Sequence, residues 1–248
     1  MIPLLVTGCT CAMTYGGGLL TLRLGAYRAF ALAFAAGALV ATALMDVIPD
    51  ALELLSRSRS SLHHHHIMFA CSLGFLAFYL FEQTAHGAGN GHHHHHHDLV
   101  PPEVSQAGLL GASGMSVHSL LDGVAIGEAF HAGTAIGWVV ALAVIVHKFA
   151  DGVSTVGIIV SVGRGEQLAR LMLAITAVAP LAGLALQWFV PLPLTALALV
   201  LGWFSGVFLY LGATALIPAA HAASGSRWLP MATLSGVTLV YLASRASM

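Results

Sequence analysis

The stretch HSLLDGVAIG, at His118–Gly127, decides how this sequence is interpreted, because HKFADGVSTVG, at His147–Gly157, repeats its pattern. Both stretches begin with His-x-x-x-Asp-Gly-Val and lie in otherwise apolar sequence. Residues i and i+4 of a helix share a face, so each stretch presents an imidazole beside a carboxylate. The connection between them has one short polar break, at 131–134, which predicts two antiparallel neighbouring helices.

The composition indicates an integral membrane protein. Of the 248 residues, 58% are hydrophobic and only 8% are charged, whereas about a quarter of the residues of a soluble domain are charged. The mean hydropathy is +0.86. A net charge of −1 provides no broad basic face, so we expect no nucleic-acid partner. The three cysteines lie in apolar stretches and indicate no disulfide framework.

Apolar segments of membrane-spanning length predict an all-α polytopic protein. They lie at 2–22, 29–55, 67–85, 104–130, 135–162, 168–190, 194–221 and 228–246. No segment outside these eight spans is large enough for a soluble domain, so residues 1–248 are expected to form a single transmembrane domain. The first span lacks a basic leader and a cleavage site, which predicts that it is retained.

Lys and Arg bias predicts the orientation of the spans. With both termini outside, the inner loops hold Arg23, Arg28, Arg164, Arg170 and Arg227, and the outer side holds Arg57, Arg59 and Arg245. The short loops favour a bacterial cytoplasmic (inner) membrane. The second and seventh spans share the motifs Val47-Ile48-Pro49 and Leu216-Ile217-Pro218, which indicate either an internal repeat or two ordinary proline kinks.

The two central motifs predict a metal site within the membrane. Each histidine lies about fourteen residues from the polar break, or roughly 20 Å along a helix. We therefore expect His118 and His147 at one depth, with Asp122 nearer one surface and Asp151 nearer the other. Two imidazoles and two carboxylates form a ligand set for a divalent transition metal. The alternative is two hydrogen-bonded core histidines and two separately paired aspartates, but ionisable groups inside a membrane favour a functional role.

Further polar residues define an expected pathway for the ion. In the predicted orientation the acidic residues of the second span and the end of the fourth span approach the outer surface, and the seventh span carries a histidine at its inner end; these residues are Asp46, Asp50, Glu53, Glu128, His131 and His221. They form either a cation-attracting vestibule or ordinary interfacial polarity at helix ends.

Two histidine tracts predict loose, reversible metal capture by loops. The outer tract comprises His63, His64, His65 and His66, and the inner, cytoplasmic loop at about 86–101 holds His86, His92, His93, His94, His95, His96 and His97. An engineered purification tag is the alternative explanation of the run of six.

These motifs resemble the ZIP (Zrt/Irt-like) family of metal transporters. The resemblance rests on His118-Ser119-x-x-Asp122-Gly123-x-Ala125-x-Gly127 and His147-Lys148-x-x-Asp151-Gly152, together with eight spans and a histidine-rich loop between the third and fourth spans. It implies import of zinc, or of Fe²⁺, Mn²⁺, Cd²⁺, Co²⁺ or Ni²⁺, towards the cytoplasm. It also implies that helices 1–3 and 6–8 form an inverted pair around helices 4 and 5. By position, the metal ligands are His118, Ser119, Asp122, His147 and Asp151.

The sequence departs from the family pattern at three points. Leu121 and Ala150 stand where proline is common, aspartate replaces the longer glutamate in both motifs, and Lys148 stands where some members have a ligand for a second metal. An ammonium group cannot ligate a metal and repels cations. We therefore expect a single-ion site, in which Lys148 either replaces the second ion electrostatically or forms a structural salt bridge to Asp122 or Asp151.

Two other functions are compatible with the motifs. An intramembrane zinc-dependent hydrolase would use His118, His147 and Asp151 to hold zinc and Asp122 as the base, although no His-Glu-x-x-His helix is present. A cation-diffusion-facilitator exporter usually has six spans and a soluble domain, whereas this sequence predicts eight spans and no segment large enough for a soluble domain. A divalent-metal uptake carrier, not an enzyme, is the favoured function, with the metal ion and the lipid bilayer as partners. The sequence leaves the oligomeric state open, with a homodimer as one alternative.

Overall fold

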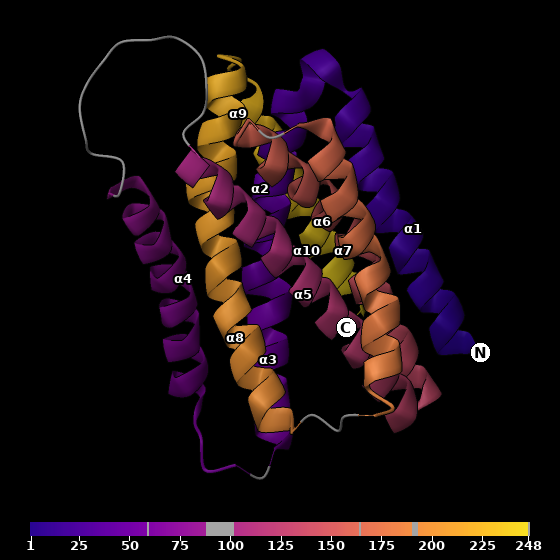
Figure 1. The fold of residues 1–248 in the computed structure, drawn as a ribbon. Coiled ribbons are helices and arrows are strands. Elements are labelled where there is room, and N and C mark those ends of the chain that lie inside the picture. Colours follow the sequence, from indigo (N-terminus) through magenta and orange to yellow (C-terminus); the bar gives the residue numbers. More distant parts are fainter. Residues whose placement is uncertain (59, 88–101, 164, 190–192, 248) are drawn as a thin grey trace.

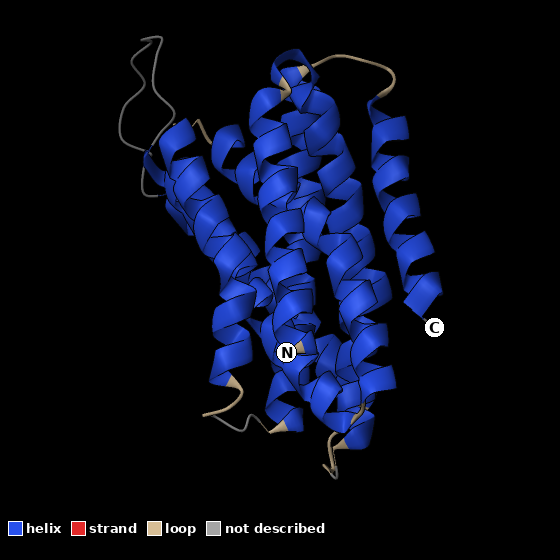
Figure 2. Ribbon diagram, turned by 90° about the vertical axis from the view of Figure 1, so that its right-hand side faces the viewer, coloured by secondary structure: helices blue, strands red, loops and turns tan. Residues whose placement is uncertain are grey.

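The computed structural model describes residues 1–248 apart from 59, 88–101, 164, 190–192 and 248, without the side chains of 26, 84–87, 102–107, 132, 136, 143, 146, 246 and 247. Every regular element in the described part is helical (Figures 1 and 2). In chain order they are α1 (Ile2–Arg23), η1 (Gly25–Tyr27), α2 (Arg28–Thr42), η2 (Ala43–Val47), α3 (Ile48–Arg57), α4 (His64–Gly87), α5 (Pro102–Ala132), α6 (Thr134–Ser161), α7 (Glu166–Leu186), α8 (Leu194–Tyr210), η3 (Leu211–Leu216), α9 (Ile217–Ala223) and α10 (Leu229–Ser247).

The predicted membrane spans are confirmed. Seven segments of the described chain are long and apolar enough to cross a bilayer, including the continuous spans Arg28–Arg57 and Leu194–Ala223. α10, with 19 residues, is an eighth long helix where the sequence predicts one. α7 ends at Leu186 rather than at residue 190, because the prolines at 191 and 193 disfavour a helical conformation in the residues just before them. The protein is therefore an all-α polytopic membrane protein.

Both proline motifs follow a π-helical turn. η2 directly precedes Ile48-Pro49, and η3 directly precedes Ile217-Pro218. Proline lacks an N–H and its ring clashes with the carbonyl four residues earlier, so a wider turn before it accommodates the ring without ending the helix. The same backbone device at the same place in both spans supports an internal repeat.

Glycine contacts show that the helix pairs α2–α10 and α8–α4 are equivalent. A Cβ at Gly37 of α2 would overlap the carbonyl oxygen of Thr233 in α10, and a Cβ at Gly206 of α8 would overlap that of Cys71 in α4. The reverse contacts repeat the pattern, since Gly236 of α10 lies against Phe34 and Gly74 of α4 lies against Trp203. Gly37 and Gly206 are as far apart in the sequence as Phe34 and Trp203. α2–α10 and α8–α4 therefore pack in the same register.

The helix pairs α1–α6 and α7–α5 are related in the same way. Gly17 of α1 approaches the carbonyl of Phe149 in α6, and Gly183 of α7 approaches that of Leu120 in α5. Gly152 of α6 lies against Thr14, and Gly123 of α5 lies against Pro180. Gly123 and Gly152 are the glycines of the two His-x-x-x-Asp-Gly motifs, so both motif helices are fixed by the same close approach. The packing has the pairing that an inverted repeat around α5 and α6 requires.

Burial places the centre of the bundle at α6. Within the most apolar window of each span, 69% of the α6 residues are buried but only 22% of those of α4. α4 lies at the margin of the bundle beside α8 (Figure 1). The polar side chains of the two central motifs are likewise buried.

Candidate metal centre

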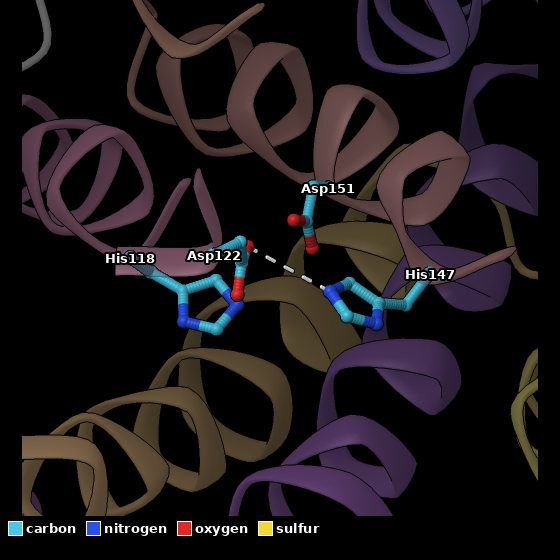
Figure 3. Close-up of side chains that lie close together, drawn as sticks. All are labelled: His118, Asp122, His147 and Asp151. Carbon is cyan, nitrogen blue, oxygen red and sulfur yellow. Dashed lines mark ion pairs between the residues drawn. The ribbon is translucent and has the colours of Figure 1, made fainter. Parts of the chain in front are cut away.

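The four side chains of the two central motifs meet inside the bundle. One ligand atom each from His118, Asp122, His147 and Asp151 lies within 4.8 Å of the other three. Figure 3 shows the two carboxylates and two imidazoles converging from α5 and α6. Their exposed fractions are only 1 to 6%. The i, i+4 spacing sets both pairs on the facing surfaces of two antiparallel helices, as the sequence predicts.

Asp122 is the common neighbour of the two imidazoles. Its Oδ2 lies 3.4 Å from Nε2 of His118 and 3.8 Å from Nε2 of His147. None of the four ring nitrogens forms a hydrogen bond among the described residues. Buried polar groups are normally hydrogen-bonded, and an unpartnered group is costly. The unpartnered ring nitrogens favour a metal site over the alternative of two hydrogen-bonded core histidines.

Lys148 occupies the space between the two carboxylates. Its side chain is completely buried. The ammonium donates to Oδ2 of Asp151 at 2.7 Å and to Oγ of Ser119 at 2.7 Å, and it forms an ion pair with Asp122. The expected salt bridge therefore exists, and it joins Lys148 to both aspartates rather than to one. Ser119 is buried and contacts the lysine ammonium.

Groups from other helices complete the surroundings of the two histidines. Asp46, in the π-helical turn η2, places Oδ2 4.0 Å from Nδ1 of His147 and accepts a hydrogen bond from Ser244 of α10. The ring of Phe208 lies edge-on to His118 at 4.6 Å between centroids. Ser244 and Phe208 were not predicted from the sequence, because each is one ordinary residue of an apolar helix and carries no motif.

The other predicted pathway residues lie away from this cluster. Asp50 is exposed on α3, and Glu53 pairs with Arg57 on the same helix. Glu128 is exposed near the end of α5, and His131 contacts the side-chain amide of Gln187. His221 is exposed on α9, where its Nδ1 lies 2.9 Å from the carbonyl of Ile217. These residues lie towards helix ends, and their part in a pathway remains a prediction.

The histidine tracts differ in how far the structure describes them. The outer tract was predicted to lie in a loop, but only His63 does so; His64 to His66 form the first turn of α4, and all four side chains are exposed. The backbone of His86 belongs to the last turns of α4, whereas its side chain and all of His92 to His97 lie outside the described residues. Metal capture by either tract remains a prediction.

Comparison with known proteins gives one family. A sequence model described as ZIP zinc transporter matches residues 2–107 and 85–240. The chain is 30% identical over 106 residues to the zinc transporter zipt-7.1 of Caenorhabditis briggsae, a match that covers 41% of the chain and 27% of that relative. It is 29% identical over 135 residues to the zinc transporter zipt-7.2 of Caenorhabditis elegans, covering 50% of the chain and 29% of that relative. The chain thus matches less than a third of each relative's length.

Proposed function

Because the chain belongs to the ZIP zinc transporter family, we propose that it carries zinc, or a similar divalent ion, through the His/Asp cluster of α5 and α6. The observation that supports this most strongly is the convergence of four buried donor groups with unpartnered ring nitrogens. In a membrane, such groups are costly unless they bind something. The motif resemblance implies these four residues as ligands together with Ser119, whose hydroxyl here accepts a hydrogen bond from Lys148.

The donor set fits a transition metal of intermediate softness. Imidazole nitrogen and carboxylate oxygen both ligate zinc, and they also accept iron, manganese, cobalt, nickel and cadmium. Selectivity among these ions depends on geometry and availability rather than on donor type. We therefore assign the substrate as zinc by family membership, with the other ions as competitors to be measured.

We propose that the site holds one ion at a time. Asp122, Asp151 and the ammonium of Lys148 leave the empty site with a net charge of −1. A divalent ion brings this charge to +1, so binding is weaker than in a closed structural cage. Weak binding suits a carrier, which must release its cargo.

We propose import into the cytoplasm with both termini outside, which the arginine distribution and the family resemblance support. In this orientation Asp50 and Glu53 lie at the outer mouth, and the loop at 86–101 receives the ion inside. The short loops favour a bacterial cytoplasmic membrane, and a homodimer is the proposed assembly. The orientation is tested by whether a membrane-impermeant reagent masks an engineered cysteine at a terminus. The homodimer is tested by the mass of the protein in detergent.

Transport requires the site to open to each side in turn. α1 packs most extensively on α6 and α7 on α5, whereas α10 packs on α2 and α4 on α8. We propose that these two groups of helices rock against each other. The metal cluster belongs to the first group, and Asp46 and Phe208 face it from the second.

Uptake into proteoliposomes tests the whole proposal. Purified protein in vesicles should accumulate zinc down an imposed gradient, with the other divalent ions tested as competitors and the gradient imposed in both directions. Vesicles that take up no more zinc than protein-free controls would refute the carrier function. The same preparation incubated with lipids and peptides tests the hydrolase alternative, for which we expect no turnover because the two pairs of groups offer no distinct acid and base.

A further inference from the structure

Lys148 stands at the point where the two halves of the repeat meet. Lys148 follows His147 as Ser119 follows His118, so Lys148 and Ser119 are equivalent positions of the repeat. Its ammonium contacts Ser119, its own counterpart, and also Asp122 and Asp151, which are counterparts of each other. One cationic group thus binds both equivalent carboxylates, as a metal ion on the symmetry axis would.

We propose that Lys148 is a tethered counter-cation that allows the empty carrier to return across the membrane. This inference rests on the proposed function, and it makes Lys148 a positioning residue that acts through the two carboxylates. When the ion leaves, the ammonium keeps the carboxylates paired. When an ion binds, the carboxylates share their oxygens between the ion and the ammonium.

The charges of α5 and α6 explain why a fixed cation helps. With Lys148 the described side chains of the cluster carry −1 when empty and +1 when loaded with a divalent ion. Without it they carry −2 when empty and are neutral when loaded. An uncompensated buried charge costs several kcal/mol. Loss of the lysine therefore raises the free energy of the empty cluster, which then carries −2, but not that of the loaded cluster, which is then neutral. Asp46 is left out of these sums because it lies on the other helix group, which in the proposed rocking motion does not move with the cluster.

A purely structural salt bridge does not require this arrangement. One carboxylate partner would be enough to neutralise a buried ammonium, and a surface pair would be cheaper. Here the ammonium is completely buried and shares both candidate ligands of the metal. It therefore competes with the cargo for the carboxylates, which a stabilising contact elsewhere in the bundle would not do.

Net uptake and exchange separate the return of the empty carrier from loaded movement. Net uptake is measured with radioactive zinc outside zinc-free vesicles, where each cycle includes an empty return. Exchange is measured with equal zinc on both sides and tracer outside, where the carrier can move loaded in both directions. Membrane potential is clamped in both assays.

We expect Lys148→Met to slow net uptake about tenfold or more, because 1.4 kcal/mol of added cost already corresponds to a factor of ten. Exchange should stay within about threefold of the parent rate. Arg170→Met is the matched control, since it breaks an exposed ion pair with Glu166 on α7 and should change neither rate. A Lys148→Met protein that loses both rates equally, or neither, would overturn the inference while leaving the carrier function intact.

The repeat supplies a second and independent test. Lys148→Ser should behave like Lys148→Met, and adding Ser119→Lys should restore net uptake by supplying the ammonium from the equivalent position on α5. Restoration supports the counter-cation role even if Lys148→Met does not fold. A folded double variant that exchanges zinc but shows no net uptake would overturn it. A parent protein that moves zinc in neither assay would refute the proposed function, and this inference with it.

Discussion

Asp122 contacts more of the polar cluster than either histidine does. Its Oδ2 lies near Nε2 of His118, Nε2 of His147 and the ammonium of Lys148. Asp151 contacts the same ammonium from the other motif. A single carboxylate oxygen therefore links both imidazoles to the buried cation. At the scale of residues, the site depends on the two aspartates as much as on the histidines.

Removal of either carboxylate should abolish uptake. In Asp122→Ala and Asp151→Ala the site loses a ligand and Lys148 loses an ion-pair partner, which leaves a buried charge poorly compensated. Zinc uptake into proteoliposomes should fall to the background of protein-free vesicles. Glu166→Ala, which changes an exposed carboxylate on α7, should transport normally. Retained uptake in either aspartate variant would remove that residue from the site.

Acid should inhibit uptake through the histidines. Imidazole binds metal only when it is neutral, so a proton on either ring removes a ligand. Uptake should therefore fall as the pH of both compartments is lowered from neutral to mildly acidic values, at a fixed free zinc concentration and clamped potential. Flux that is unchanged across this range would count against ligation by His118 and His147.

At the scale of elements, glycine sets how closely the helices approach. Gly17 on α1 allows the backbone of α6 to come near, and Gly152 on α6 allows the same for α1. The equivalent contacts join α5 to α7. In a membrane, where burial in lipid gives helices little reason to associate, such close packing stabilises the bundle. The positions of both motif helices depend on it.

A pair of neighbouring glycines tests this role of close packing. A side chain at Gly17 would overlap the carbonyl of Phe149, whereas a side chain at Gly16 would meet nothing within 4 Å. We expect Gly17→Val to destabilise the protein by about 1–3 kcal/mol or more, the usual cost of overpacking, and Gly16→Val to be tolerated. Thermal unfolding in detergent measures the difference. Equal melting temperatures for the two variants would contradict the packing described here.

At the scale of the whole molecule, the two halves are equivalent in packing but not in charge. The π-helical turn η2 carries Asp46 beside His147, whereas its counterpart η3 contains no acidic residue. Likewise Lys148 faces Ser119 across the repeat. The site therefore has one acidic neighbour and one ammonium on a framework that is otherwise paired. This asymmetry favours one bound ion over two equivalent ions.

The purified protein should bind one zinc ion per chain. The ammonium between Asp122 and Asp151 occupies the space that a second cation would need, and it repels one at a few ångströms. The stoichiometry can be measured by equilibrium dialysis with metal analysis, using protein that lacks the 86–101 loop and carries alanine in place of His63 to His66, so that neither histidine tract contributes. Two ions per chain in that protein would exclude the single-ion site.

The sequence by itself determined the class of protein, the spans and the two pairs of candidate ligands. These follow from local properties, since hydropathy over a helix length predicts a span and i, i+4 spacing predicts a shared face. The proline motifs of the second and seventh spans also indicated a repeat before the packing was known. The end of α7 was misplaced, because the prolines that follow it were given too little weight, and α4 begins at His64 rather than at residue 67.

Tertiary structure alone decided what surrounds those ligands. Whether Lys148 bound Asp122, Asp151 or both depends on how α5 and α6 rotate against each other, which no local spacing fixes. Asp46 and Phe208 reach the histidines from two other segments, and Ser244 of α10 donates a hydrogen bond to Asp46. Side chains that meet across the bundle are set by glycine-mediated helix packing over long sequence separations, and this physical information is not present in any single stretch of the chain.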